Sequence, residues 1–129
     1  MQVTITCSED QARVMMEALD LYSRLNMGQF DEAWRAVEES PRFSKESLEA
    51  ARECADELSR ACFPSLEGGS YFGIVGPGVS DKAKRSWEVY SAIRHTLSWA
   101  KHPEGGITVN FDKPMSLTGE KFPEVVCEL

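Results

Sequence analysis

Residues 2–25 read QVTITCSEDQARVMMEALDLYSRL, and the spacing of their apolar side chains changes at Ser8. Before Ser8, apolar and polar residues alternate strictly, which predicts a half-buried strand over residues 2–7. Ser8 and Gln11 have the spacing of a capping box, so a helix is expected to begin at Glu9. Two apolar stripes then cover close to half of the helix surface and predict that this helix is the central one: Ala12, Met15, Leu19 and Tyr22, and Val14, Ala18, Leu21 and Leu25.

Three further helices are predicted from the same periodicity and from the residues that interrupt it. Gly28 ends the first helix, and residues 29–39 predict a shorter amphipathic helix with an inward face of Phe30, Ala33, Trp34 and Val37. After Pro41, Ser44 is placed to cap a third helix, which runs to Cys62 with a stripe of Leu48, Ala51, Ala55, Leu58 and Cys62. Ser80 is placed to cap a fourth helix over residues 81–101, whose expected buried face is Ala83, Trp87, Tyr90, Ile93, Leu97 and Ala100.

Alternating residues also predict strands in the C-terminal part of the chain. Residues 107–111 form one such run, and Val125, Cys127 and Leu129 indicate a short third strand. Strands that are polar on one face suit an antiparallel sheet whose other face is covered by helices. We therefore expect an α+β fold in which about four helices, with a long central one, pack on one face of a small antiparallel sheet of two to three strands. The chain is expected to form a single domain over residues 1–129, in which the Gly-rich loop 65–79 precedes the final helix and strands.

The composition of the 129 residues is that of an ordinary globular domain, with 42% hydrophobic and 27% charged residues. No apolar run is long enough to span a membrane, and the N-terminal residues do not have the pattern of a signal peptide. The net charge of −7 argues against binding to duplex nucleic acid, which requires Lys and Arg at the phosphates. The acidic excess lies in residues 1–64, with 13 acidic and 7 basic side chains, whereas residues 65–129 have 8 and 7.

The sequence contains no pattern typical of a catalytic or metal-binding site. Its four cysteines, Cys7, Cys54, Cys62 and Cys127, have no CxxC spacing, so reduced thiols are expected and no metal is implied. GxSxG, HExxH and P-loop motifs are absent, and no cofactor is implied. We therefore expect a binding protein rather than an enzyme, with turnover through His95 as a third interpretation.

The fourth predicted helix contains the best candidate ligand-binding residues. Arg94 follows Tyr90 by four residues and lies at the edge of the apolar stripe, where a guanidinium is suited to stacking on a base and gripping a phosphate. The adjacent His95 is the second candidate on this helix, because histidine is the side-chain type suited to changes of charge at physiological pH. The alternatives are that Arg94 extends from the edge of the core to an acidic neighbour, and that His95 is an ordinary residue at the edge of the helix.

Two other segments contribute candidates to the same site. The Gly-rich loop 65–79 contains Tyr71 and leads into a helix start rich in Lys and Arg, where free amides favour an anion. A polar–aromatic cluster at the end of the first helix adds Arg24 and Gln29. The alternative for the loop is that it is a flexible connector. The alternative for the cluster is that its residues only pack two helices of a hairpin around Gly28. The predicted ligand-binding residues are Arg24, Gln29, Tyr71, Tyr90, Arg94 and His95.

Four strings of the sequence resemble those of a group of small phage and prophage proteins. They are LDLYSRLNMGQF (19–30), YFGI (71–74), YSAIRHTLSW (90–99) and PEGGITVNFDKP (103–114). The resemblance implies a phage origin, and it places the protein in the cytoplasm of an infected bacterial host, where reduced cysteines are expected. Small accessory phage proteins without catalytic machinery often act by binding and blocking, which includes sequestering nucleotide signals of host immunity.

The sequence and the resemblance together predict a phage accessory protein that counters host defence. We expect it to bind and sequester a small anionic, nucleotide-like ligand, with the arginines on phosphate and the tyrosines stacked on the base. A homo-oligomer is expected, because a pocket shared between copies can enclose a ligand that one small domain cannot. The alternative is an inhibitor or adaptor of a host protein that uses the acidic face of residues 31–57, with nine carboxylates against four cations. No membrane or duplex nucleic acid is expected as a partner.

Overall fold

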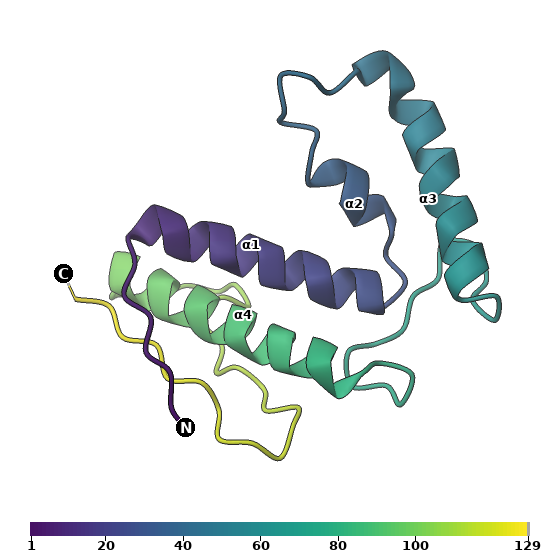
Figure 1. Cartoon of the computed structure of the whole chain (residues 1–129). Helices are drawn as coiled ribbons and strands as arrows, with labels where there is room; N and C mark the ends of the chain where they lie inside the picture. The colour runs from purple at the N-terminus through teal and green to yellow at the C-terminus, as the bar shows by residue number, and fades with distance from the viewer. Residues whose placement is uncertain (129) are drawn as a thin grey trace. The chain divides into compact units, whose positions relative to one another are not determined.

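The computed structural model describes residues 1–128, and these residues contain helices but no strands (Figure 1). The α-helices are α1 (Glu9–Asn26), α2 (Asp31–Arg35), α3 (Leu48–Cys62) and α4 (Asp81–Lys101). A short 3-10 helix, η1 (Lys45–Ser47), leads directly into α3. The expected α+β class is therefore wrong, and the part of the chain that the structure describes is all-helical.

Among residues 1–128, the segments expected to form strands lack a neighbouring strand to pair with. The backbone groups of residues 2–7 make no hydrogen bond to any other residue among 1–128. Residues 107–111 take part in two local turns, in which the amides of Phe111 and Asp112 donate to carbonyls three residues earlier, at 3.0 and 3.3 Å. The third expected strand ends at Leu129, outside the described residues, and its Val125 carbonyl accepts a side-chain hydrogen bond from Thr96 at 3.5 Å. A strand forms only where a neighbouring backbone supplies partners, so alternation alone does not make a sheet.

The helix starts predicted from capping residues are confirmed at α1 and α4. The Ser8 amide donates to Oε1 of Gln11 at 3.0 Å, and the Gln11 amide donates to the Ser8 hydroxyl at 3.2 Å. This reciprocal pair satisfies two amides at the start of the helix, and α1 begins at Glu9 as expected. The Ser80 hydroxyl accepts a hydrogen bond from the Ala83 amide at 3.2 Å, and α4 has the predicted bounds 81–101.

The second and third helices differ from their predicted bounds. α2 has five residues rather than the expected eleven over 29–39. Ala33 and Val37 of its expected inward face are exposed. The third helix begins as η1, and Ser44 makes no side-chain hydrogen bond that would cap it. An amphipathic pattern lowers the cost of a helix, but each end depends on whether the terminal amides and carbonyls find partners.

The described residues form two compact units, and each is considered by itself. One unit joins residues 1–20 to the residues from 85 onward, so it contains the first part of α1 and most of α4. The hydroxyl of Ser86 donates to the carbonyl of Leu19 at 2.9 Å and links these two helical segments. Ala92 and Ile93 are buried in this unit.

The other unit comprises Leu21–Lys84. The Ser23 hydroxyl donates to the Ala83 carbonyl at 3.2 Å, and both residues are fully buried. α2 packs against α3. The Phe63 ring lies between Phe30 and Phe72, with ring centroids 6.0 and 5.4 Å away. These aromatic contacts join the turn after α1, the end of α3 and the Gly-rich loop into one packed cluster.

Candidate ligand-binding site

Arg94 is a half-buried arginine of α4 that forms no ion pair with any residue among 1–128. Its Nη1 donates to the Tyr90 hydroxyl at 3.1 Å, and its guanidinium carbon lies 5.0 Å from the centroid of the Tyr90 ring. Its Nε is buried and has no hydrogen-bond partner among the described residues. Four other arginines pair with carboxylates: Arg13, Arg24, Arg35 and Arg85. The structure therefore leaves a partly desolvated cation without a counter-charge.

Tyr90, one turn away, holds this guanidinium in place and is itself packed against Trp87. Tyr90 contacts Trp87, with ring centroids 5.2 Å apart and planes inclined by 58°. Arg94 and Tyr90 are four residues apart on α4, so they lie on the same side of the helix. A guanidinium fixed by one hydrogen bond and by an aromatic face keeps other N–H donors for a bidentate contact with a phosphate or carboxylate. An unsatisfied buried donor costs about 1–3 kcal/mol, which a bound anion that reaches this N–H group would offset.

His95 is held by the loop that follows α4. Its Nδ1 lies 3.2 Å from the carbonyl oxygen of Asn110. A carbonyl oxygen only accepts hydrogen bonds, so Nδ1 carries the proton of this contact. The ring also contacts the edge of Trp99, whose Nε1 donates to the Phe111 carbonyl at 3.2 Å. Consecutive residues of a helix point about 100° apart, so His95 faces this loop rather than the direction of Arg94.

Arg24 and Gln29 contact each other across the turn that ends α1. Nη1 of Arg24 donates to Oε1 of Gln29 at 3.0 Å and lies 3.9 Å from Oε1 of Glu32. Gly28 makes this turn at φ +88°, in the left-handed region that favours glycine. Arg24 therefore already has an amide and a carboxylate as partners, and an anion there would compete with Glu32.

Tyr71 lies on a Gly-rich loop that is anchored at the next residue. The Phe72 amide donates to the Met27 carbonyl at 2.8 Å, and the Phe72 ring makes an edge contact with Phe63. The Tyr71 side chain is 60% exposed. The loop is therefore attached at Phe72 and leaves Tyr71 exposed to solvent.

The six predicted ligand-binding residues are divided between the two units. Arg24, Gln29 and Tyr71 belong to Leu21–Lys84, whereas Tyr90, Arg94 and His95 belong to the other unit. Within their units, Arg94 contacts Tyr90, and Arg24 contacts Gln29. Tyr71 is exposed on its loop, and His95 contacts Asn110.

Glu88 is a structurally important residue that the sequence did not single out. It is only 3% exposed, and its Oε1 accepts hydrogen bonds from the amides of Leu117 and Thr118 at 2.7 and 2.8 Å. Its Oε2 accepts from the Thr118 hydroxyl at 2.9 Å. Burial raises the pKa of Glu88, but these donors outweigh it, and the net pKa lies below the usual 4.5. The only signal in the sequence was a single acidic residue in the basic stretch from Lys82 to Lys101.

The structure adds two observations on metals and membranes. No group of three or more His, Cys, Asp or Glu side chains in residues 1–128 is arranged to hold a metal ion. None of the described helices combines the length and the apolar character needed to cross a membrane. Comparisons with protein-family models, with curated proteins and with solved structures found no match to this chain.

Proposed function

We propose that this protein binds a small anionic, nucleotide-like ligand through Arg94 and sequesters it, as a phage accessory protein that acts against host defence. The observation that carries the ligand part is the half-buried guanidinium without a carboxylate partner among the described residues. The chain has 21 acidic and 14 basic side chains, so carboxylates for pairing are abundant. A cation that is partly withdrawn from water but unpaired is suited to an external anion.

The chemistry around Arg94 favours a phosphate attached to an aromatic group. Arg94 supplies the charge and the N–H donors, while Tyr90 beside it, with Trp87 packed on Tyr90, provides aromatic surface. The resemblance to phage proteins supports the biological context, because sequestration of nucleotide signals needs binding without turnover. Arg24, Gln29, Tyr71 and His95 stay predictions as further ligand contacts.

Calorimetric titration tests this proposal, with cyclic and linear nucleotides and with inorganic phosphate as probes. We expect heat with at least one nucleotide, and a loss of affinity of about 100-fold in Arg94→Ala, because a charge-assisted bidentate contact is worth about 3 kcal/mol. Arg60→Ala is the matched control, since Arg60 is an exposed arginine of α3, and its affinity should equal that of the parent. Circular dichroism of each variant verifies the fold. Absence of heat with every probe, or equal affinity in Arg94→Ala, would contradict the proposal.

A second candidate function is the inhibition of a host protein through the acidic helical face. Five carboxylates of η1 and α3 are exposed and form no ion pair with any residue among 1–128: Glu46, Glu49, Glu53, Asp56 and Glu57. Carboxylates that are fully hydrated and unpaired remain available to a basic surface.

The two candidates are separated by capture from a bacterial lysate with quantified bound proteins. A triple variant with Glu46, Glu49 and Glu53 changed to lysine is compared with Arg94→Ala. If the acidic face binds the partner, the triple variant loses the captured protein and Arg94→Ala retains it. Capture that is unchanged in the triple variant contradicts the acidic-face candidate and leaves the ligand site, which the calorimetric titration tests.

A further inference from the structure

Residues 2–7 form an uncharged and exposed segment with unpaired backbone groups. None of their N–H or C=O groups has a hydrogen-bond partner among the described residues. Val3 and Ile5 are 71% and 69% exposed, although both belong to the apolar set of the alternating pattern. An exposed backbone of this kind, with alternating apolar side chains, is a template for pairing with another strand.

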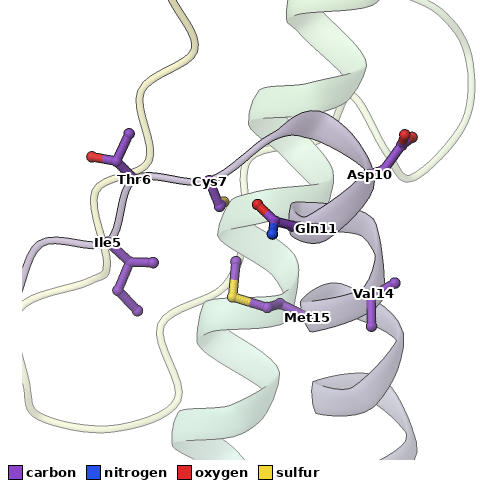
Figure 2. Close-up of a pocket in the computed structure, with 7 residues that line it drawn as sticks. All are labelled: Ile5, Thr6, Cys7, Asp10, Gln11, Val14 and Met15. Atoms are coloured by element: carbon purple, nitrogen blue, oxygen red, sulfur yellow. The ribbon is translucent and has the colours of Figure 1, made fainter.

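An apolar hollow of about 570 Å³ lies between this segment and the first turns of α1 (Figure 2). Its lining is Ile5, Thr6, Cys7, Asp10, Gln11, Val14 and Met15. In Figure 2 the side chains of Ile5 and Cys7 point to the side of Met15, whereas Thr6 points away from it. Val14 on the helix remains 65% exposed. Residues 5–7 therefore keep the alternating side-chain directions of a strand, and their apolar side faces the open hollow.

We propose that residues 2–7 of two copies of this chain pair as antiparallel strands centred on Ile5. In this register Ile5 lies opposite the partner's Ile5, and Val3 lies opposite the partner's Cys7. On the other face, Thr4 lies opposite the partner's Thr6. Directly opposed side chains of an antiparallel pair share a face, so this register puts the apolar residues of both copies over the hollow beside Met15.

The symmetry of the segment favours a second copy as the partner. The sequence Val3-Thr4-Ile5-Thr6-Cys7 alternates in the same way when read from either end, so pairing about a two-fold axis at Ile5 places apolar residues opposite apolar ones and threonine opposite threonine. A shift of the pairing by one residue would place Val3 and Ile5 opposite threonines and break this match.

Charge and interface size limit where two copies can meet and how tightly they bind. Each copy has a net charge of −7, so two copies repel each other and are expected to meet at a surface without charged side chains, such as residues 2–7. A standard interface uses about 20–30 residues on each side, and six strand residues with part of the hollow supply only a fraction of that. We therefore expect a reversible dimer that dissociates on dilution.

Sedimentation velocity over a wide concentration range tests the dimer. The parent should convert from monomer to dimer between about 5 and 500 μM, the range expected for a small interface. Ile5→Glu places two carboxylates opposite each other and should stay monomeric throughout. Val75→Glu adds the same charge at another aliphatic residue that is 65% exposed, and it should dimerise like the parent. Ile5 is exposed, so the fold of Ile5→Glu should survive, which circular dichroism verifies. A parent that stays monomeric, or an Ile5→Glu variant that associates equally well, overturns the proposal.

Disulfide trapping tests the register. In a chain that retains Cys7 and has serine at the other three cysteines, Val3→Cys should form a link to the partner's Cys7 on mild oxidation with diamide, which takes up the two thiol hydrogens. Gln2→Cys is the matched control, because residue 2 lies on the opposite face and one position out of register. Mass spectrometry of peptides should show the link between positions 3 and 7 in large excess over the link between 2 and 7. Equal amounts of both links, or pairing of the segment with an unrelated protein in place of a second copy, overturn the proposal. The test does not depend on Arg94, so it can fail while the ligand proposal holds.

Discussion

Glu88 of α4 holds residues 117–118, which come after this helix in the chain, close to the helix through hydrogen bonds. Its carboxylate accepts hydrogen bonds from the Leu117 and Thr118 amides and from the Thr118 hydroxyl. Glu88 itself is only 3% exposed, whereas Leu117 and Thr118 are half-buried. One buried carboxylate therefore accepts two backbone amides and a hydroxyl from the half-buried residues Leu117 and Thr118.

The first prediction is that Glu88→Ala destabilises the fold. The free energy of unfolding should fall by about 2–3 kcal/mol, because hydrogen bonds to a charged acceptor are lost and two half-buried amides lose their partner. Chemical denaturation measures this change, and hydrogen exchange should show faster exchange of the Leu117 and Thr118 amides. Glu124→Ala is the control, since the Glu124 side chain is 75% exposed, and its effect should stay below about 0.5 kcal/mol. Equal effects of the two substitutions would contradict the prediction.

The second prediction concerns the pH dependence of the same residue. The pKa of Glu88 in the folded chain is below its usual value of 4.5, so its stabilising effect is complete above that value and is lost as the pH falls through the folded-state pKa. The difference in unfolding free energy between the parent and Glu88→Gln should therefore be constant from neutral pH to about pH 5 and shrink below about pH 4.5. Denaturation curves between pH 7 and pH 3 measure it. A difference that grows on acidification would mean that the carboxyl is favoured in its protonated form.

At the scale of single elements, the helices follow local signals and the expected strands do not. The capping box of Ser8 and Gln11 predicted the start of α1 because its hydrogen bonds join residues three apart. Residues 107–111 have an equally clear alternation, yet they close turns. A helix satisfies its backbone within itself, whereas a strand depends on a second segment that local sequence does not specify.

The third prediction is that Gly28→Ala weakens the turn between α1 and α2. The φ of +88° costs an L-residue about 1–2 kcal/mol, and the new Cβ would lie 2.6 Å from the Cδ1 atom of Leu66. This Leu66 atom ends a flexible side chain and can shift, so backbone strain should dominate the loss of stability. Thermal unfolding measures it. Gly68→Ala is the control, because nothing lies within 4 Å of its new Cβ, and it should be neutral or slightly stabilising. A neutral Gly28→Ala would show that the turn relaxes to another conformation.

At the scale of the whole molecule, the net negative charge affects how strongly two copies of the chain associate. The fourth prediction is that salt strengthens the proposed dimer, because it screens the repulsion between two chains of charge −7. The dissociation constant should fall by about threefold or more between 20 and 300 mM NaCl, as measured by sedimentation. Val75→Glu should respond in the same direction. A dimer that weakens with salt would instead indicate contacts between opposite charges.

The candidate site was only partly predictable from the sequence. The four-residue spacing of Tyr90 and Arg94 on a predicted helix was enough to bring them together. That Arg94 lacks a carboxylate partner among the described residues, and that Glu32 pairs with Arg24, required the positions of distant side chains. His95 was singled out as a histidine beside Arg94, but its contact with Asn110 depends on the path of the loop after α4.

The sequence by itself determined the α1 and α4 helices, their capping residues, the turn at Gly28 and the uneven distribution of charge. These features depend on residues a few positions apart or on composition alone. Only the tertiary structure decided that residues 2–7 and 107–111 are not paired strands, that Glu88 is a buried acceptor and that Arg94 is left without a carboxylate among residues 1–128. The physical reason is that hydrogen bonds within a helix are local, whereas strand pairing and buried charge depend on which distant groups come within reach.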